Sequence, residues 1–538
     1  MKQFRAGYDL KTVDDTLLKF DDSDGVFGRS DPTHFLPFES LSSASAIPGS
    51  TDGTIHDAYP AADHPVDATS VSSTQLAADK PVATIAQLAD YLINGFWQYT
   101  GDIAHHWGVS TISYNISGLN AAEQFLAQSA LNAWHEVANL SFVQTTGNAN
   151  ITFNHSGNMT AFETDSYDSS GIMSSATVDI SRNWITTDGG AYDGQKGIDS
   201  YGYQTYVHEI GHALGLGHQG PYNGSADYAT DATYANDTWQ YSVMSYNSQD
   251  NFDGGSYRYV VTPQMADTYA VAEIYGAATT RTDDTTYGFH STAGSIYDFS
   301  TYRQAPALTI YDGGGNDTLD ASGYTMAQTI DLHDGSFSSI GGLTHNIGIA
   351  VGTTIENAIG GRGADTLIAN DAGDTLNGGA GNDILTGGAG NDILIGGNGN
   401  NTLNGGGGDD RLTGGTGNDT LVGGAGRDIL TGGGGSDIFK FLSAGDSGVT
   451  GATRDVIQDF LIGSDKIDLS SIDAVAGGSD DPFHFVGTSA FSGTAGELRE
   501  FAQGANTIVA GDINGDRVND FQIQLHGTHI LSATDFML

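Results

Sequence analysis

Hydrophobic and polar positions repeat with a period of nine residues between Gly360 and Lys440. Nine consecutive units fill this segment, and the eighth place is Leu in eight of them and Phe439 in the last. One apolar position in nine cannot give a helix a useful apolar face, whereas glycines permit the tight turns of a coil. The period therefore predicts stacked coils, each with a short strand that points its apolar side chain into a shared core.

The sixth place of each unit carries an aspartate, except at Asn401. Stacking would bring these carboxylates into register, where they repel unless divalent cations that prefer oxygen ligands bind between them. The repeat resembles the calcium-binding nonapeptide of RTX proteins, which forms a parallel β-roll. A flexible glycine-rich linker is the alternative, and it does not explain the strict register. We expect weaker calcium sites, or none, at the Asn401 unit and at 369–377. The predicted ligands are Asp365, Asp374, Asp383, Asp392, Asp410, Asp419, Asp428 and Asp437.

The amino-acid composition and the hydrophobic pattern of the chain change at about residue 277. Residues 82–277 are mixed in character and contain all five tryptophans, which predicts one compact core. A capping box that starts at Asn120 predicts a helix, and alternation over 149–154 predicts a strand. After residue 277 the chain is rich in Gly and Asp and reads as all-β. We therefore expect an N-terminal extension over 1–80, a globular domain over 81–277 and an all-β domain over 278–538.

Composition narrows the class of protein. The 19 Lys and Arg residues face 65 Asp and Glu residues, so the net charge is −46, which disfavours nucleic acid and anionic membranes as partners. The absence of cysteine excludes disulfides and thiolate metal sites. No apolar run is long enough to span a membrane, and the N-terminus lacks the apolar stretch of a signal peptide. If the protein is exported, we expect its export signal to lie outside the N-terminus.

The strongest chemical signal is a histidine motif between residues 208 and 218. His208 and His212 are four residues apart and would project from one face of a helix. Gly215 can leave the helix and bring His218 round as a third nitrogen ligand. Three imidazoles leave one position on Zn²⁺ open for water, as a catalytic site requires. Glu209 is the expected general base, which takes a proton from this water and passes it to the leaving amine. A structural zinc site is the alternative.

A second motif, Ser242-Val-Met244-Ser-Tyr246, follows the histidines at the distance of a metzincin Met-turn. Together the two motifs resemble the serralysins, the secreted RTX metzincin proteases of Gram-negative bacteria. The resemblance covers about residues 82–538. The further matching segments are 201–205, 233–238, 275–277, 280–285, 314–320 and 354–360.

The resemblance implies an α+β metzincin-type catalytic domain, followed by an all-β C-terminal domain with a calcium-binding parallel β-roll. It implies one catalytic zinc and several structural calcium ions. It also implies that Tyr246 binds zinc at rest and stabilises the oxyanion during turnover. Asp283 stands where the family has Gly, but a carbonyl ligand there would survive the change. The segment 219–223 departs from the family, so the wall of the substrate cleft is expected to differ. The implied calcium ligands at the domain junction are Arg281, Asp283, Thr285, Asp312, Gly314, Gly315, Asp317, Thr354 and Glu356.

Two ends of the chain and one loop carry weaker signals. The C-terminal residues 535–538, one acid and three hydrophobics, resemble the signal of type I secretion substrates, although a closing strand is the alternative. Residues 7–18 resemble the first helix of the family catalytic domain, and a longer propeptide is the competing interpretation. Residues 512–520 have oxygen ligands at loop spacing for one more calcium, and a hairpin turn is at least as well supported.

These observations together predict a secreted zinc endopeptidase that acts on proteins or peptides. The expected partners are the type I secretion machinery and a proteinaceous inhibitor, and we expect a monomer with no nucleic-acid partner and no membrane span. A non-catalytic RTX surface or adhesion protein with a vestigial metal site is the alternative. The complete set of His208, Glu209, His212, His218 and Tyr246 argues against it.

Overall fold

A computed structural model describes residues 53–57, 80–155, 160–183, 197–475, 477 and 481–538. The helix predicted over 7–18 and one of the five tryptophans, Trp184, lie outside these residues. Within them, no helix has both the length and the hydropathy that a membrane span needs.

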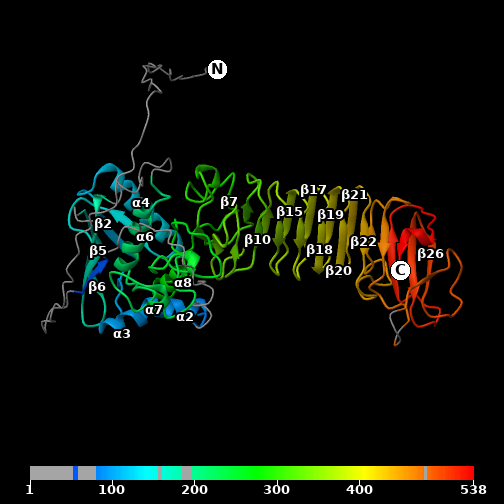
Figure 1. The fold of residues 1–538 in the computed structure, drawn as a ribbon, viewed down its shortest axis with the longest axis horizontal. Helices are drawn as coiled ribbons and strands as arrows, with labels where there is room; N and C mark the ends of the chain where they lie inside the picture. Colours follow the sequence, from blue (N-terminus) through cyan, green and yellow to red (C-terminus); the bar gives the residue numbers. More distant parts are fainter. Residues whose placement is uncertain (1–52, 58–79, 156–159, 184–196, 476, 478–480) are drawn as a thin grey trace, which may run out of the picture. The chain divides into compact units, whose positions relative to one another are not determined.

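The first part of the described chain forms a six-stranded sheet with the order β1-β5-β6-β4-β2-β3. Figure 1 labels its strands β2, β5 and β6. Strand β5 runs antiparallel to both β1 and β6, and the other neighbours are parallel. The strand predicted over 149–154 is β4. The strands are β1 (Gly53–Asp57), β2 (Thr111–Asn115), β3 (Ser141–Gln144), β4 (Ile151–Asn154), β5 (Ala161–Tyr167) and β6 (Met173–Ile180).

Helices pack on this sheet and around the histidine motif. The predicted capping box is present: Asn120 accepts from the backbone N–H of Glu123, and the Glu123 carboxylate accepts from that of Asn120. Helix α4 packs on α6, which carries the motif and lies against β5 and β6. The helices are α2 (Ile85–Asp90), η2 (Tyr91–Gly95), α3 (Phe96–Thr100), α4 (Ala121–Val137), α6 (Tyr201–Ala213), α7 (Tyr228–Asp231), η4 (Gln249–Asn251) and α8 (Met265–Tyr275).

The described residues after α8 are all-β apart from two single turns of 3₁₀ helix, η5 (Phe299–Thr301) and η6 (Ala533–Asp535). Most of its strand pairs are parallel, and the C-terminal β26, β27 and β28 form an antiparallel meander. Strands β8, β11 and β12 form a small separate sheet. The strands are β7 (Thr286–Gly288), β8 (Leu308–Ile310), β9 (Thr318–Asp320), β10 (Thr329–Asp331), β11 (Phe337–Ser338), β12 (Ile347–Ile349), β13 (Asn357–Ile359), β14 (Thr366–Ile368), β15 (Thr375–Ala380), β16 (Ile384–Thr386), β17 (Ile393–Asn398), β18 (Thr402–Gly407), β19 (Arg411–Thr416), β20 (Thr420–Ala425), β21 (Ile429–Gly434), β22 (Ile438–Lys440), β23 (Val456–Ile457), β24 (Lys466–Asp468), β25 (His484–Phe485), β26 (Glu497–Gln503), β27 (Asn506–Asp512), β28 (Phe521–Leu525) and β29 (Phe536–Met537).

The nine-residue repeat forms two parallel sheets that successive strands join in turn (Figure 1). Strand β15 therefore pairs with β17, which places Leu376 beside Leu394, two units further along. All nine eighth-place side chains are fully buried, so the predicted apolar column is confirmed. The turns need glycine because the coils approach closely: Gly399 has φ +125°, and a Cβ there would lie 1.6 Å from the Gly381 carbonyl oxygen.

The loop over 513–520 joins β27 to β28 as a hairpin, which agrees with the second interpretation of this segment. The Asp512 carboxylate accepts from the backbone N–H groups of Gly515 and Arg517 at 2.7 and 2.9 Å. The loop amides therefore satisfy both oxygens of this side chain.

Candidate metal centre

Helix α6 presents the histidine motif and ends where the sequence predicts. Ser200 caps its N-terminus by accepting from the Tyr203 N–H at 3.1 Å. Gly215 follows the helix with φ +93°, and a Cβ there would lie 2.0 Å from the His105 carbonyl oxygen. Only glycine fits this left-handed turn. The turn returns the chain towards the helix and brings His218 beside His212.

The three histidines converge on one point through their Nε2 atoms. The Nε2 atom of His212 lies 3.1 Å from that of His208 and 3.1 Å from that of His218. The Nδ1 atoms of His208 and His212 face the carbonyl oxygens of Val243 and Leu216 at 2.8 and 2.7 Å. Carbonyls only accept, so both Nδ1 atoms carry the proton and both Nε2 lone pairs face inward. Lone pairs this close repel each other, and a cation between them removes the repulsion.

Two further parts of the motif lie against the histidines. Glu209 is fully buried on α6, directly after the first histidine. Met244 is also fully buried and packs under the helix: a Cβ at Gly211 would lie 2.5 Å from its Sδ atom. This contact agrees with Met244 as the apolar floor of the site. The close approach explains why a glycine stands between Glu209 and His212.

Two buried aspartates, which sequence reasoning missed, hold the Met-turn from both ends. Asp267 on α8 accepts from the Ser242 hydroxyl at 2.6 Å and the Val243 N–H at 2.7 Å. Asp237 accepts from the hydroxyls of Tyr222 and Ser245, both at 2.7 Å. Burial raises the pKa of each carboxyl to about 6. Asp237 lies in the matching segment 233–238, but no local pattern assigned this role to either aspartate.

Tyr246 follows the Met-turn and lies beside the histidines. Its ring centroid is 4.6 Å from that of His218 and 5.9 Å from that of His208. The Tyr222 ring contacts both Tyr246, at 5.0 Å, and His218, at 5.9 Å, and its hydroxyl accepts from the Tyr246 N–H at 3.4 Å. The turn over 219–223, which was expected to differ from the family, therefore supplies a ring that supports Tyr246.

Three of the residues predicted to bind calcium at the junction, Asp312, Asp317 and Glu356, form a cluster of acidic side chains. Asp317 is fully buried, and its Oδ1 accepts from the Thr285 N–H at 2.7 Å. Its own N–H donates to Glu356 at 2.7 Å. Burial, with the nearby charges of Asp312 and Glu356, raises its pKa to about 7. The Oδ2 atom is buried with no hydrogen-bond partner among the described residues.

The other predicted junction residues differ in how they are used. Gly315 lies against the cluster, because a Cβ there would be 2.8 Å from the Asp283 carbonyl oxygen. The backbone N–H of Gly314 donates to Asp312 at 2.8 Å. Thr354 is exposed, and the side chain of Arg281 points away towards Glu136 of α4. Most of the predicted junction residues therefore lie together, with Thr354 apart from them. Arg281 faces the loop at Gly313 through its carbonyl oxygen and not through its side chain.

The sixth-place residues of the roll form two ladders of hydrogen bonds. In each, the backbone N–H of one residue donates to the carboxylate or carboxamide two units on, as Asp365 does to Asp383 at 2.8 Å. Burial raises the pKa of Asp374 and Asp410 to about 7. Buried ladder oxygens without a hydrogen-bond partner, again among the described residues, belong to Asp374, Asp383, Asp410, Asp419 and Asp428.

Both ladders continue beyond the nine units, to residues that the sequence analysis did not identify. Asp428 donates its N–H to Asp455 at 2.9 Å, and Asp437 donates to Asp465 at 3.1 Å. Asp455 is fully buried, and burial raises its pKa to about 8. Its spacing from Asp428 is 27 residues instead of 18, because a loop is inserted. Since 27 residues are three periods of nine, Asp455 stays in phase with the repeat, although Gly448 takes the apolar eighth place within the inserted loop. A search for the period beyond Lys440 could therefore have found it.

Comparisons with known proteins agree with both halves of this fold. Residues 106–224 match the family model described as Matrixin, and residues 276–538 match the model described as Peptidase M10 serralysin C terminal. The catalytic fold and the buried histidine cluster define a metalloendopeptidase of the metzincin class.

Whole-chain relatives give the family. Metallopeptidase AprA of Pseudomonas marginalis is 37% identical over 484 residues, which cover 84% of this chain and 91% of that protein. A serralysin of Photorhabdus luminescens is 38% identical over 432 residues, 78% of this chain and 76% of that protein. The chain belongs to the serralysin family. Among solved structures, the R3 subunit of the Azotobacter vinelandii mannuronan C5-epimerase AlgE6 matches 29% of this chain and 77% of that subunit, at 30% identity and a TM-score of 0.20.

Proposed function

We propose that this metalloendopeptidase is a zinc enzyme whose catalytic residues are Glu209 and Tyr246. The convergence of three Nε2 atoms at one buried point carries the proposal. Three nitrogen donors with no thiolate suit catalytic Zn²⁺ and leave a position open. We assign His208, His212 and His218 as its ligands, with Tyr246 as the further ligand at rest.

Zinc, when bound, supplies a Lewis acid that polarises the scissile carbonyl and makes a water more acidic. Glu209 takes a proton from the attacking water and returns it to the leaving amine. Its complete burial keeps solvent away from this transfer. The Tyr246 hydroxyl donates a hydrogen bond to the oxyanion. The carbonyls that accept from the Nδ1 atoms of His208 and His212 fix the orientation of both rings.

We also propose that calcium binds along the roll and at the junction. Buried carboxylate oxygens without partners support this, because such atoms are costly unless a cation satisfies them. The proposed roll ligands are the eight predicted aspartates together with Asp455 and Asp465. The proposed junction ligands remain those predicted, through side chains or carbonyls. Binding to the folded state alone makes folding of the roll depend on calcium.

The proposed domain bounds are 81–277 for the catalytic domain and 278–538 for the all-β domain, with residues 1–80 as an extension. Such a protein would leave the cell through type I secretion machinery and fold where calcium is abundant. Its substrates are proteins and peptides, and its proposed working form is an extracellular monomer. A proteinaceous inhibitor would act by blocking access of substrates to the histidine site.

Casein hydrolysis by the purified full chain tests the catalytic proposal. We expect hydrolysis in millimolar calcium, its loss when a zinc-selective chelator removes the metal, and its return on addition of Zn²⁺. Mutation of His212 to Ala should abolish both zinc binding and hydrolysis. Hydrolysis that survives complete removal of zinc would exclude the mechanism. Zinc binding without any peptide hydrolysis would instead support a vestigial site.

A further inference from the structure

The chain crosses from the catalytic part to the all-β part beside the C-terminal end of α4. The Asn139 N–H donates to the Gly276 carbonyl at 3.1 Å, and the Thr280 hydroxyl donates to the Glu136 carbonyl at 2.7 Å. The next residue, Arg281, turns its side chain back towards α4. The crossing is therefore attached to the helix that supports α6.

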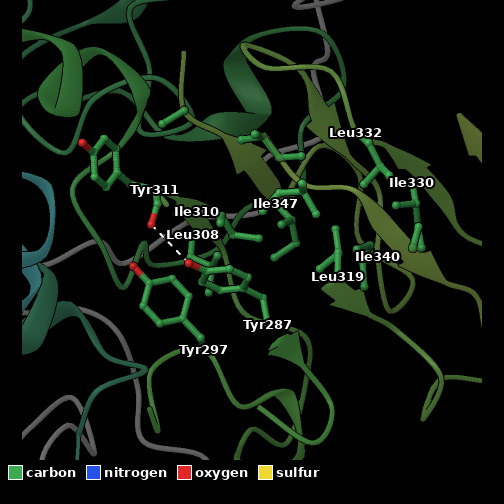
Figure 2. Close-up of a cluster of buried hydrophobic side chains, with 14 of the residues drawn as sticks. Tyr287, Tyr297, Leu308, Ile310, Tyr311, Leu319, Ile330, Leu332, Ile340 and Ile347 are labelled. Carbon is green, nitrogen blue, oxygen red and sulfur yellow. Dashed lines mark hydrogen bonds between the residues drawn. The ribbon is translucent and has the colours of Figure 1, made fainter. Parts of the chain in front are cut away.

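Arg281 and Glu136 form an ion pair in an aromatic setting. Their Nη2 and Oε2 atoms are 2.5 Å apart, and the side chains are 11% and 26% exposed. The guanidinium group lies over the Tyr297 ring, 4.4 Å from its centroid, and donates to the Tyr311 carbonyl at 3.2 Å. Figure 2 shows Tyr287, Tyr297 and Tyr311 gathered at one end of the buried cluster. Burial raises the pKa of Glu136, and the Arg281 charge opposes this shift.

The backbone of Arg281 belongs to the acidic cluster at the junction. Its carbonyl accepts from the Gly313 N–H at 3.2 Å, next to Asp312. Tyr287, which flanks the guanidinium, donates to Asp312 at 2.5 Å. The backbone at Arg281 has φ +52°, a left-handed conformation that is unfavourable for a non-glycine residue and needs support from its surroundings. Arg281 thus contacts the acidic cluster through its backbone and α4 through its side chain.

Glu136, the other partner of the ion pair, is connected to the histidine helix α6 through Trp134. Glu136 lies two residues after Trp134, whose indole N–H donates to the Val207 carbonyl at 2.9 Å. Val207 directly precedes His208. A Cβ at Gly211 would lie 3.1 Å from the Trp134 ring, so the ring also contacts the helix between its two histidines. Both contacts are buried and leave little room for α4 to shift without moving α6.

We propose that the Arg281–Glu136 pair couples the junction cation site to the zinc site, so that each metal tightens the binding of the other. This inference rests on the proposed function, since it takes calcium at Asp312 and Asp317 and zinc at the histidines. Calcium fixes the loop that holds Arg281, Arg281 fixes Glu136, and α4 with Trp134 fixes the turn of α6 that carries His208 and His212. Arg281 and Glu136 are positioning residues. The coupling is reciprocal by thermodynamic linkage.

A double-mutant cycle on zinc affinity tests the coupling. The full chain is kept in saturating calcium, its fold is checked by circular dichroism, and the zinc dissociation constant is measured by chelator competition. Asp317→Asn, which disables the junction site but spares the roll, should weaken zinc binding about tenfold, within the range of coupled sites. In a Glu136→Gln background the same change should weaken it less than about twofold. Glu273→Gln, an exposed glutamate on α8, is the matched control and should leave the tenfold effect intact.

An equal effect of Asp317→Asn with and without Glu136 would overturn the coupling, as would no effect on zinc affinity in the wild-type background. If Asp317→Asn does not fold, Glu356→Gln removes a charge from the same cluster and takes its place. Wild-type protein that binds no zinc would instead refute the proposed function. If the wild-type protein binds zinc and hydrolyses casein but the double-mutant cycle shows no coupling, only the coupling would be refuted.

Discussion

Asn401 interrupts one carboxylate ladder of the roll, and its replacement by aspartate should make stability more dependent on calcium. Its Oδ1 atom accepts from the Asp383 N–H at 3.0 Å, as an aspartate would. Its Nδ2 group donates to the carbonyls of Gly399 and Gly414 at 3.3 and 3.2 Å. The amide group thus satisfies turn carbonyls that a cation would otherwise bind. The coil at Asn401 should therefore be stable without an ion.

The size of the effect follows from these contacts. Loss of two long hydrogen bonds costs roughly 1 kcal/mol in total. The new carboxylate would resemble Asp383, whose pKa burial raises to about 6. Since one pKa unit corresponds to about 1.4 kcal/mol, ionising such a group at neutral pH costs about 2 kcal/mol after allowance for its partial solvation. Asn401→Asp should thus lower the free energy of unfolding by about 3 kcal/mol at low calcium. A new site contributes about 2.7 kcal/mol when calcium reaches 100 times its dissociation constant, so the deficit should nearly vanish there.

Urea unfolding of the full chain at calcium concentrations from 0.1 to 10 mM measures this difference, and isothermal titration counts the ions. Asn400→Asp adds the same charge at the neighbouring exposed position and is the control. It should change stability little and add no ion. A deficit of constant size at every calcium concentration, or an unchanged number of bound ions in Asn401→Asp, would refute the reasoning.

Mutation of Glu209 to Ala should lower kcat by a factor of about 10² to 10⁴ with zinc still bound, because only the general base is lost. Metal analysis and an activity assay on the same sample check this prediction, and activity within tenfold of wild type would contradict it. Tyr246→Phe should lower kcat far more than it changes KM, because its hydroxyl acts on the transition state; a raised KM at unchanged kcat would make it a ground-state contact. Without calcium, the roll should lose stability as the pH rises from about 4 to about 8. Burial raises the folded-state pKa of Asp374 and Asp410 to about 7 and that of Asp455 to about 8, so the unfolded chain releases these protons at lower pH. Thermal unfolding in chelator at pH 5 and pH 8 tests the sign, and a higher midpoint at pH 8 would be inconsistent with it.

Sequence reasoning identified the features that local spacing determines. The turn at Gly215 and the apolar column of the roll follow from offsets of a few residues. The capping box at Asn120 does so as well. These parts agree with the structure because a helix turn or a nine-residue coil brings such neighbours together without help from the rest of the fold.

The features that sequence reasoning missed depend on contacts between distant segments. Asp267 reaches the Met-turn from the next helix, across more than twenty residues. Glu136 meets Arg281 only after the whole catalytic sheet has been built. Asp465 ends one ladder 28 residues after Asp437, which is out of phase with the nine-residue period. Buried carboxylates of this kind have no sequence signature, and only the tertiary fold shows what they bind.

Because successive coils alternate between two sheets, the number of repeats has a fixed parity. Strand β23, which carries the C-terminal meander, continues the sheet of β21, and β24 continues the sheet of β22. Deletion of one nine-residue unit would send β23 to the opposite sheet and turn the meander to the other face. Deletion of two units would shorten the roll and leave every later strand on its own sheet. The roll can therefore change length without rebuilding its ends only in steps of eighteen residues, and a gain or loss of a single unit should be selected against.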